Sequence, residues 1–374
     1  MPSNIRPAVF EDCIAASALL KELGLNMPAE PAQVRVHWQR FWQSNPALQG
    51  AGPQPDLGWV MEDTEDAGTM VGFFGNIPLL YSYGTQRIIV ADASQWGVLK
   101  SHRADTHLLC DAYFQQKNID LLLVTTGIKP TGRIFEQYDS LKVPQPGYDE
   151  ILFWVVNSEG FLQSILRKKN WDNAILRAGA TVLSPALTFE RTISRRKPSA
   201  KLKTVDRLTL SEISDDFDDL WQRKQNEAER LLACRNAACL RWHFEAPVFE
   251  NKTTILACKN NRLDGYAIVV EEDAPDIGLK RLKIADVLIA GDDEDVFRSL
   301  LAEAYVLAQE KNCHVLELIG LPPHLRKIAQ GAKPFSRRMP VWPAYYKPSA
   351  FDSDQLTRTD TWYLTPYDGD TLLM

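Results

Sequence analysis

Several features that reveal a protein's class are missing from this sequence of 374 residues. It contains no apolar run long enough to span a membrane, and its first residues lack the basic segment and apolar core of a signal peptide. Its six cysteines are scattered and form no C-x-x-C pair. Several of them lie within apolar periodic runs, which favours buried, reduced thiols. We therefore expect a cytoplasmic protein without a membrane span.

Excess positive charge and the common catalytic motifs are missing as well. The net charge is −6, which argues against a general binder of nucleic acid or of anionic membranes. No G-x-S-x-G elbow, P-loop or Rossmann fingerprint occurs, and no Ser, His and Asp follow in the order of a hydrolase triad. The function must therefore be sought in other patterns.

A duplication organises the chain. Its length favours two domains over one ordinary core, and similarity at a fixed period is the first feature to seek in such a chain. Segments of the first half recur about 193 residues further on. The matches pair Arg87-x-x-Val90-Ala91-Asp92 with Arg281-x-x-Ile284-Ala285-Asp286, Leu108-Leu109-x-Asp111-Ala112-Tyr113 with Leu300-Leu301-x-Glu303-Ala304-Tyr305, Lys117-Asn118 with Lys311-Asn312, and Gly127-x-x-Pro130 with Gly320-x-x-Pro323. We expect two copies of one α+β unit.

The duplication divides the chain into three parts. Residues 1–157 form the first expected domain and residues 204–374 the second, each a mixed β-sheet flanked by helices. Residues 158–203 begin with a helical pattern and continue as a basic stretch that Pro198 interrupts. We interpret that stretch as a solvated linker rather than an anion-binding arm, because isolated charge runs are usually solvated.

The stretch from Arg87 to Thr126 carries the strongest functional pattern. Apolar and β-branched residues predict a strand over Ile88 to Val98, which a short loop joins to a helix and a second strand. A helix that starts behind a strand in this way presents unpaired backbone N–H groups, which suit a phosphate. In the second copy the loop is Gly291-Asp292-Asp293-Glu294-Asp295, whose four carboxylates suit a helix N-terminus but repel a pyrophosphate. We expect the anion site in the first copy, and a supporting role for the second as a wall of the substrate cleft.

This stretch resembles the acyl-CoA site of the GNAT superfamily of N-acyltransferases. In that family the fourth strand ends in a Val-led loop with the motif Arg/Gln-x-x-Gly-x-Gly/Ala, and Val98 and Arg103 match it. Three residues stand where the motif usually has glycine or a small residue: Ala104, Thr106 and Leu108. The resemblance implies an α+β fold of two GNAT-like mixed sheets in tandem, each flanked by helices.

The resemblance also implies a binding site. Acetyl-CoA or another acyl-CoA is the expected co-substrate, and no metal is expected. The residues expected to bind it at the strand end and the loop are Trp96, Gly97, Val98, His102, Arg103, Ala104, Asp105, Thr106 and His107. Tyr83 and Thr126 are expected substrate contacts, from their positions alone. Asp105 has a second interpretation, as the N-cap of the helix.

Aminolysis of a thioester needs a base for the amine and a proton donor for the leaving thiolate. The resemblance implies Asp92 as the base. It implies Tyr138 as the donor, because Phe135 occupies the family's usual tyrosine position. Asp92 also has a structural interpretation, which its persistence as Asp286 in the second copy favours.

The implied function is transfer of an acyl group from acyl-CoA, or from an acyl carrier protein, to an amine of a small molecule or of a sugar or polysaccharide precursor. Two alternatives stay open. Fem-type ligases that use aminoacyl-tRNA also join two such units, and the missing glycines and tyrosine favour a non-catalytic binding protein. Near the C-terminus, Asp368-Gly369-Asp370 is interpreted as a turn with acidic flanks.

Overall fold

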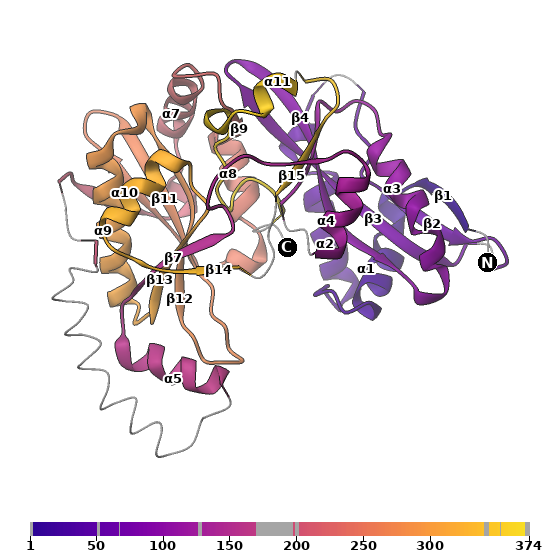
Figure 1. Cartoon of the computed structure of the whole chain (residues 1–374), viewed down its shortest axis with the longest axis horizontal. Coiled ribbons are helices and arrows are strands. Elements are labelled where there is room, and N and C mark those ends of the chain that lie inside the picture. The colour runs from indigo at the N-terminus through magenta and orange to yellow at the C-terminus, as the bar shows by residue number, and fades with distance from the viewer. Residues whose placement is uncertain are drawn as a thin grey trace.

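The computed structural model describes residues 3–50, 53–66, 68–125, 129–169, 197–198, 202–339, 344–351 and 353–370. It contains two mixed β-sheets, each flanked by helices (Figure 1). The expected α+β architecture of two sheet units is therefore confirmed. We call the unit built on the first sheet the first unit, and the other the second unit.

The first sheet has the strand order β1-β2-β3-β4-β5-β15-β6, and β9 also pairs with β3. Strands β4 and β5 are parallel, and the other neighbours on this path are antiparallel. The strand bounds are β1 Ser3–Pro7, β2 Gly58–Asp63, β3 Met70–Tyr83, β4 Gln86–Val98, β5 Leu121–Val124, β6 Leu141–Lys142, β9 Leu231–Ala233 and β15 Tyr345–Pro348.

The second sheet repeats this pattern with the order β8-β10-β11-β12-β13-β7-β14. Strands β12 and β13 are parallel, as β4 and β5 are, and the other neighbours are antiparallel. The bounds are β7 Glu150–Val155, β8 Val205–Leu208, β10 Thr253–Lys259, β11 Leu263–Glu271, β12 Arg281–Ile289, β13 Val315–Ile319 and β14 Phe335–Arg338. The sequence repeat thus corresponds to a repeat of sheet topology.

The two units exchange strands beyond the pairing of β9 with β3. β7 comes from the first half of the chain but pairs with β13 and β14 of the second sheet. β15 comes from the second half but pairs with β5 and β6 of the first sheet. β7 lies within residues 1–157, the first expected domain, yet it belongs to the second sheet. The exchange ties the two units together through backbone hydrogen bonds.

Helices cover both faces of the first sheet. Apolar residues of α1 and α2 pack against one face, in a core that continues into the second unit, whereas α3 and α4 cover the other face. We call these the junction face and the outer face. The helix bounds are α1 Cys13–Glu22, α2 Pro31–Trp42, α3 Thr106–Phe114, α4 Lys129–Gln137, α5 Ser158–Lys168, α7 Asp215–Gln225, α8 Ala237–Phe244, α9 Glu294–Glu310, α10 Pro323–Gly331 and α11 Ser353–Leu356.

Candidate active site of the first unit

A tight helical turn joins β4 to α3 in the first unit. β4 ends at Val98, and the 3₁₀ helix η3 (Lys100–Asp105) leads directly into α3. Among the described residues, no side chain caps either helix. The first N–H groups of a helix have no acceptor within it, so this turn keeps donors for an external group. Arg103 is exposed on the turn, where it adds a positive charge.

Two of the residues that were expected to bind acyl-CoA, His102 and Asp105, contact other side chains of the protein. His102 is buried, and its Nε2 lies 3.4 Å from Oδ2 of Asp63 in β2. Asp105 accepts a hydrogen bond from Oγ of Ser3 at 2.7 Å. Asp105 occupies the N-cap position of α3, as its second interpretation expected, but its side chain makes no capping hydrogen bond. The structure does not turn these two side chains toward a common anion.

The following residues close the turn. Thr106 Oγ1 donates to the Arg103 carbonyl at 2.8 Å, and His107 Nδ1 lies 3.0 Å from the Ala104 carbonyl. Ala104 and His107 are exposed beside Arg103. Arg103 makes no ion pair within the described part of the chain, so its charge remains available for a ligand.

β4, the strand that leads into this turn, pairs with its parallel neighbour β5 over only part of its length. β4 and β5 pair at Val90, Ala91 and Asp92, and β4 then runs on to Val98. A bulge interrupts β4 at Gln95, whose φ of 49° is strained for a non-glycine residue. The bulge sends Trp96 to the outer face, where it stacks on Phe74 with ring centroids 4.9 Å apart. Beyond Asp92, none of the described strands pairs with this edge of β4.

Close packing explains why position 97, also a predicted contact of the ligand, is a glycine. A Cβ at this position would lie 2.4 Å from Cδ1 of Leu23, the residue that follows α1. Glycine thus lets the end of α1 approach β4 closely. Val98, the next residue, is buried in the outer-face core.

Asp92 lies where the pairing of β4 with β5 ends. Its side chain is 0% exposed, and neither carboxylate oxygen has a hydrogen-bond partner of normal geometry among the described residues. Burial raises the pKa of Asp92 well above its ordinary value, and the carboxylate of Asp370 raises it further, while the Asp370 backbone offsets part of the rise. Buried polar groups without partners are rare and gather at functional sites.

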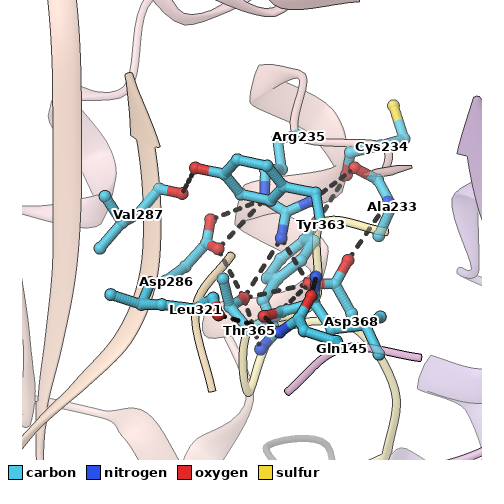
Figure 2. A network of polar contacts seen from close by, with 12 residues as sticks. Gln145, Ala233, Cys234, Arg235, Asp286, Val287, Leu321, Tyr363, Thr365 and Asp368 are labelled. Atoms are coloured by element: carbon cyan, nitrogen blue, oxygen red, sulfur yellow. Dashed lines mark hydrogen bonds and ion pairs between the residues drawn. The ribbon is translucent and has the colours of Figure 1, made fainter. Parts of the chain in front are cut away.

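The equivalent residue of the second unit, Asp286, is fully engaged. It accepts hydrogen bonds from Arg235 Nε at 3.0 and 3.1 Å, from Tyr266 Oη at 2.9 Å and from Thr365 Oγ1 at 2.8 Å. Figure 2 shows Asp286 beside Arg235 and Thr365 in this network. A structural role therefore explains the aspartate at position 286. Asp92 makes none of the equivalent contacts.

The other proposed contacts do not gather around Asp92. Tyr138 follows α4 on the outer face, where its hydroxyl donates to Asp111 Oδ1 at 2.6 Å. Asp92 alternates with the outer-face residues Ala91 and Ala93 and therefore points to the junction face. Tyr83 pairs with Gln86 at the opposite end of β4, about 30 Å from Trp96 along the strand. Thr126 lies outside the described residues.

Comparison with known proteins settles the fold. No protein-family model matches the chain, and no curated protein matches it at a significant level. A probable N-acyltransferase from Enterococcus faecalis V583 aligns with a TM-score of 0.59 at 9% identity, over 95% of this chain and 74% of its own. A GCN5-related N-acetyltransferase from Anabaena variabilis aligns with a TM-score of 0.57 at 11% identity, over 93% and 73%. Saccharomyces cerevisiae N-myristoyltransferase with bound myristoyl-CoA aligns with a TM-score of 0.50 at 14% identity, over 92% and 83%. The chain has a GNAT fold.

In the second GNAT unit, carboxylates accept hydrogen bonds from the backbone N–H groups at the start of the helix. The equivalent groups of the first unit have no side-chain cap among the described residues. Asp293 accepts from the backbone N–H groups of Asp295 and Val296 at 2.8 and 3.1 Å. Glu227 Oε1 accepts from Gly291 N–H at 2.5 Å. These side chains take the place that an anion would take at the start of this helix.

Asp292 in the same loop contacts three basic side chains. Its carboxylate lies 2.6 Å from Lys224 Nζ, 2.8 Å from Arg230 Nη1 and 3.1 Å from His324 Nε2. Burial raises the pKa of Asp292, but His324 and Lys224 overcome this and hold the pKa below its ordinary value. The loop of the second GNAT unit is therefore neutralised internally.

Asp292→Asn is expected to lower the free energy of unfolding by about 1–3 kcal/mol at pH 7, because hydrogen bonds to charged groups are lost. Since the folded pKa lies below the unfolded value of 3.8, this stabilisation is present above pH 4 and is lost as the pH falls. Urea unfolding at pH 7 and at pH 3 measures the difference. Asp206→Asn, an exposed strand position, is the control. Equal midpoints for Asp292→Asn and wild type at pH 7 would contradict the assignment.

Sequence reasoning missed the polar network around Arg235. This buried arginine contacts Asp286, Thr365 and Asp368 (Figure 2). Its guanidinium carbon lies 4.7 Å from the ring centroid of Tyr367. No motif marks it, since its partners lie 51 to 133 positions away in the chain. The only signal was Asp368-Gly369-Asp370, in which Gly369 adopts a φ of 138°.

The described residues also bear on metals and membranes. No three His, Cys, Asp or Glu side chains among them lie close enough together to hold a metal ion. None of the described helices is long and apolar enough to cross a membrane. All six cysteines are free and buried.

Proposed function

We propose that the chain is an acyl-CoA-dependent N-acyltransferase whose chemistry takes place in the first GNAT unit. The observation that carries this proposal is the contrast between Asp92 and Asp286. Duplicated aspartates at one position of the fold have diverged, one into a satisfied structural group and the other into a buried carboxylate that has no hydrogen-bond partner of normal geometry among the described residues. A buried carboxylate with a strongly raised pKa suits a general base.

The residues of the turn support acyl-CoA as the co-substrate. Arg103 and the first N–H groups of η3 are proposed to hold the pyrophosphate, since no described side chain caps them. The end of β4 beyond its pairing with β5, from Ala93 to Val98, is proposed to lie beside the pantetheine. The N-myristoyltransferase of the same fold holds myristoyl-CoA, which agrees with this class of ligand.

Asp92 is proposed to accept the proton of the acceptor amine. As the nitrogen attacks the thioester carbonyl, the N–C bond forms and the C–S bond breaks. The amine proton passes to Asp92, and the departing CoA thiolate takes a proton from solvent. Burial makes Asp92 a stronger base than an exposed aspartate, because its charged form is desolvated.

We propose a small-molecule amine or the amine of a sugar precursor as the acceptor, and the cytoplasm as the location. A base that is 0% exposed favours a slender acceptor over the surface of a folded protein. Six free thiols suit a reducing compartment. An acyl carrier protein could present the same thioester and phosphate chemistry in place of CoA.

Arg103→Ala is expected to weaken acyl-CoA binding about 10- to 100-fold, because a charge-assisted phosphate contact is lost. Isothermal calorimetry with acetyl-CoA and myristoyl-CoA measures the affinity. Arg298→Ala removes a basic residue near the start of α9, the equivalent helix of the second unit, and should bind as wild type does. Absence of heat with either ligand in the wild type would contradict the proposal. A stable complex with aminoacyl-tRNA in its place would favour the ligase alternative.

A further inference from the structure

Two of the six cysteines lie together at the start of α8. Cys234 follows β9, Cys239 lies in the first turn of α8, and their thiol groups form a hydrogen bond with each other. The sulfur of Cys234 points away from the network around Arg235 (Figure 2). These two cysteines are 6% and 5% exposed, whereas the other four are 3% exposed or less. A small reagent therefore reaches this pair more readily than the other thiols.

A cavity of about 20 Å³ lies beside the pair, which is enough space for a water molecule. Both cysteines line it, together with His243, Tyr367 and Leu80 of β3. His243 is 1% exposed, and its Nε2 has no hydrogen-bond partner among the described residues. A small molecule that forms hydrogen bonds, such as water or hydrogen peroxide, suits both the size of the cavity and this nitrogen.

The surroundings of the pair make Cys234 the more acidic thiol. The hydrogen bond from Cys239 lowers the pKa of Cys234, against the effect of burial, and the backbone of Asn236 and the charge of Arg235 lower it further. The same hydrogen bond and burial raise the pKa of Cys239. In the other four cysteines burial raises the pKa. Because the thiolate is the reactive form of a cysteine, Cys234 is the thiol that reacts first.

We propose that Cys234 and Cys239 are a reversible disulfide site, at which hydrogen peroxide oxidises the pair. Cys234 attacks one peroxide oxygen, so that an S–O bond forms, the O–O bond breaks and a water leaves. Cys239 then attacks the sulfur of the resulting sulfenic acid, the S–O bond breaks, and the disulfide forms with loss of a second water. Two thiols and one peroxide thus give one disulfide and two waters. Exchange with a reducing thiol reverses the change.

The disulfide lies at the junction of the two units. The Cys234 N–H donates to the Leu80 carbonyl at 2.7 Å, which attaches this residue to β3 of the first sheet. At the other end of α8, Arg40 Nη2 of α2 donates to the His243 carbonyl at 2.6 Å. Oxidation therefore restricts the turn that carries Arg235, between two points that already contact the first unit. Arg103 and η3 take no part in it, so the inference is independent of the proposed function.

Peptide mapping without reduction tests the site in the folded wild-type protein. Trypsin cleaves after Arg235, so the two cysteines lie on separate peptides. Hydrogen peroxide in native buffer is expected to consume two of the six thiols and to link these two peptides, and dithiothreitol should restore all six thiols. Cys258→Ser, which removes a thiol of β10, should form the same disulfide. Six intact thiols after treatment, or a disulfide between any other two cysteines, overturns the inference.

Trapping of sulfenic acid tests which cysteine reacts first. Cys239→Ser, treated with peroxide and then unfolded in urea with dimedone, should carry the dimedone adduct on Cys234. In Cys234→Ser, Cys239 should remain a thiol. Near-UV circular dichroism shows whether each variant folds, and alanine replaces serine where the buried hydroxyl prevents folding. An adduct on Cys239, with none on Cys234 in the partner variant, overturns the assignment of Cys234 as the attacking thiol.

Discussion

Arg235→Met is expected to lower the free energy of unfolding by about 3–5 kcal/mol, because it leaves buried carboxylates without their cation. Arg235 is fully buried and bonded to Asp286, Asp368, Thr365 and the Ala233 carbonyl. Methionine fills similar space but donates no hydrogen bond. The carboxylates must then accept protons or stay charged in a dry environment, and either outcome disfavours the folded state.

Urea unfolding at pH 7 measures this loss. Arg358→Met is the matched control, since Arg358 forms an exposed ion pair with Asp360, and its midpoint should stay at the wild-type value. Adding Asp286→Asn and Asp368→Asn to Arg235→Met should restore part of the stability, because the stranded charges are removed with their partner. A midpoint for Arg235→Met equal to that of the wild type would show that the network does not hold the junction.

Asp92→Asn is expected to lower the rate of acyl transfer by about 10²- to 10⁴-fold, the range that general-base catalysis contributes. Asparagine keeps the size of the side chain and cannot take up the amine proton. Acyl-CoA affinity should stay at the wild-type value, because the proposed phosphate contacts lie at Arg103 and η3. Release of the CoA thiol from acetyl-CoA or myristoyl-CoA, with a panel of primary amines as acceptors, measures the rate.

The same substitution has an unusual effect on stability. The folded pKa of Asp92 is raised above its unfolded value of about 3.8, so the chain loses stability as the pH rises from this value toward the folded pKa. Asp92→Asn removes that loss and should unfold at a higher urea concentration than the wild type at pH 8, with little difference at pH 3. Asp206→Asn, exposed on β8, should change neither rate nor stability. Wild-type turnover by Asp92→Asn would rule out Asp92 as the base.

Features with a local cause could be predicted from the sequence. The strand before Val98, the helix that ends at Phe114 and the hairpins of both halves follow from apolar periodicity within short windows. The duplication could be read from matched residues without any knowledge of their contacts. Asp105 shows the limit, because η3 extends the helical turn ahead of α3 and directs that side chain to Ser3.

The candidate site could be predicted only in part. The exposed Arg103 on a turn without caps agrees with the expected anion site, whereas His102 is drawn to Asp63 from another strand. Tyr138 lies on the outer face, and this placement depends on which side of the sheet α4 packs. Local pattern identifies residue types that suit a ligand, but the partner of each side chain comes from distant segments.

By itself the sequence determined that the chain is a duplicated α+β protein and that its two loops at the equivalent helix starts differ in charge. Tertiary structure alone decided that the halves exchange β7 and β15, that Asp286 meets Arg235, and that Asp92 lies near Asp370 and pairs with no cation among the described residues. The physical reason is that hydrophobic periodicity specifies which face of an element is buried, whereas the environment of a buried charge depends on groups that folding brings together from far along the chain.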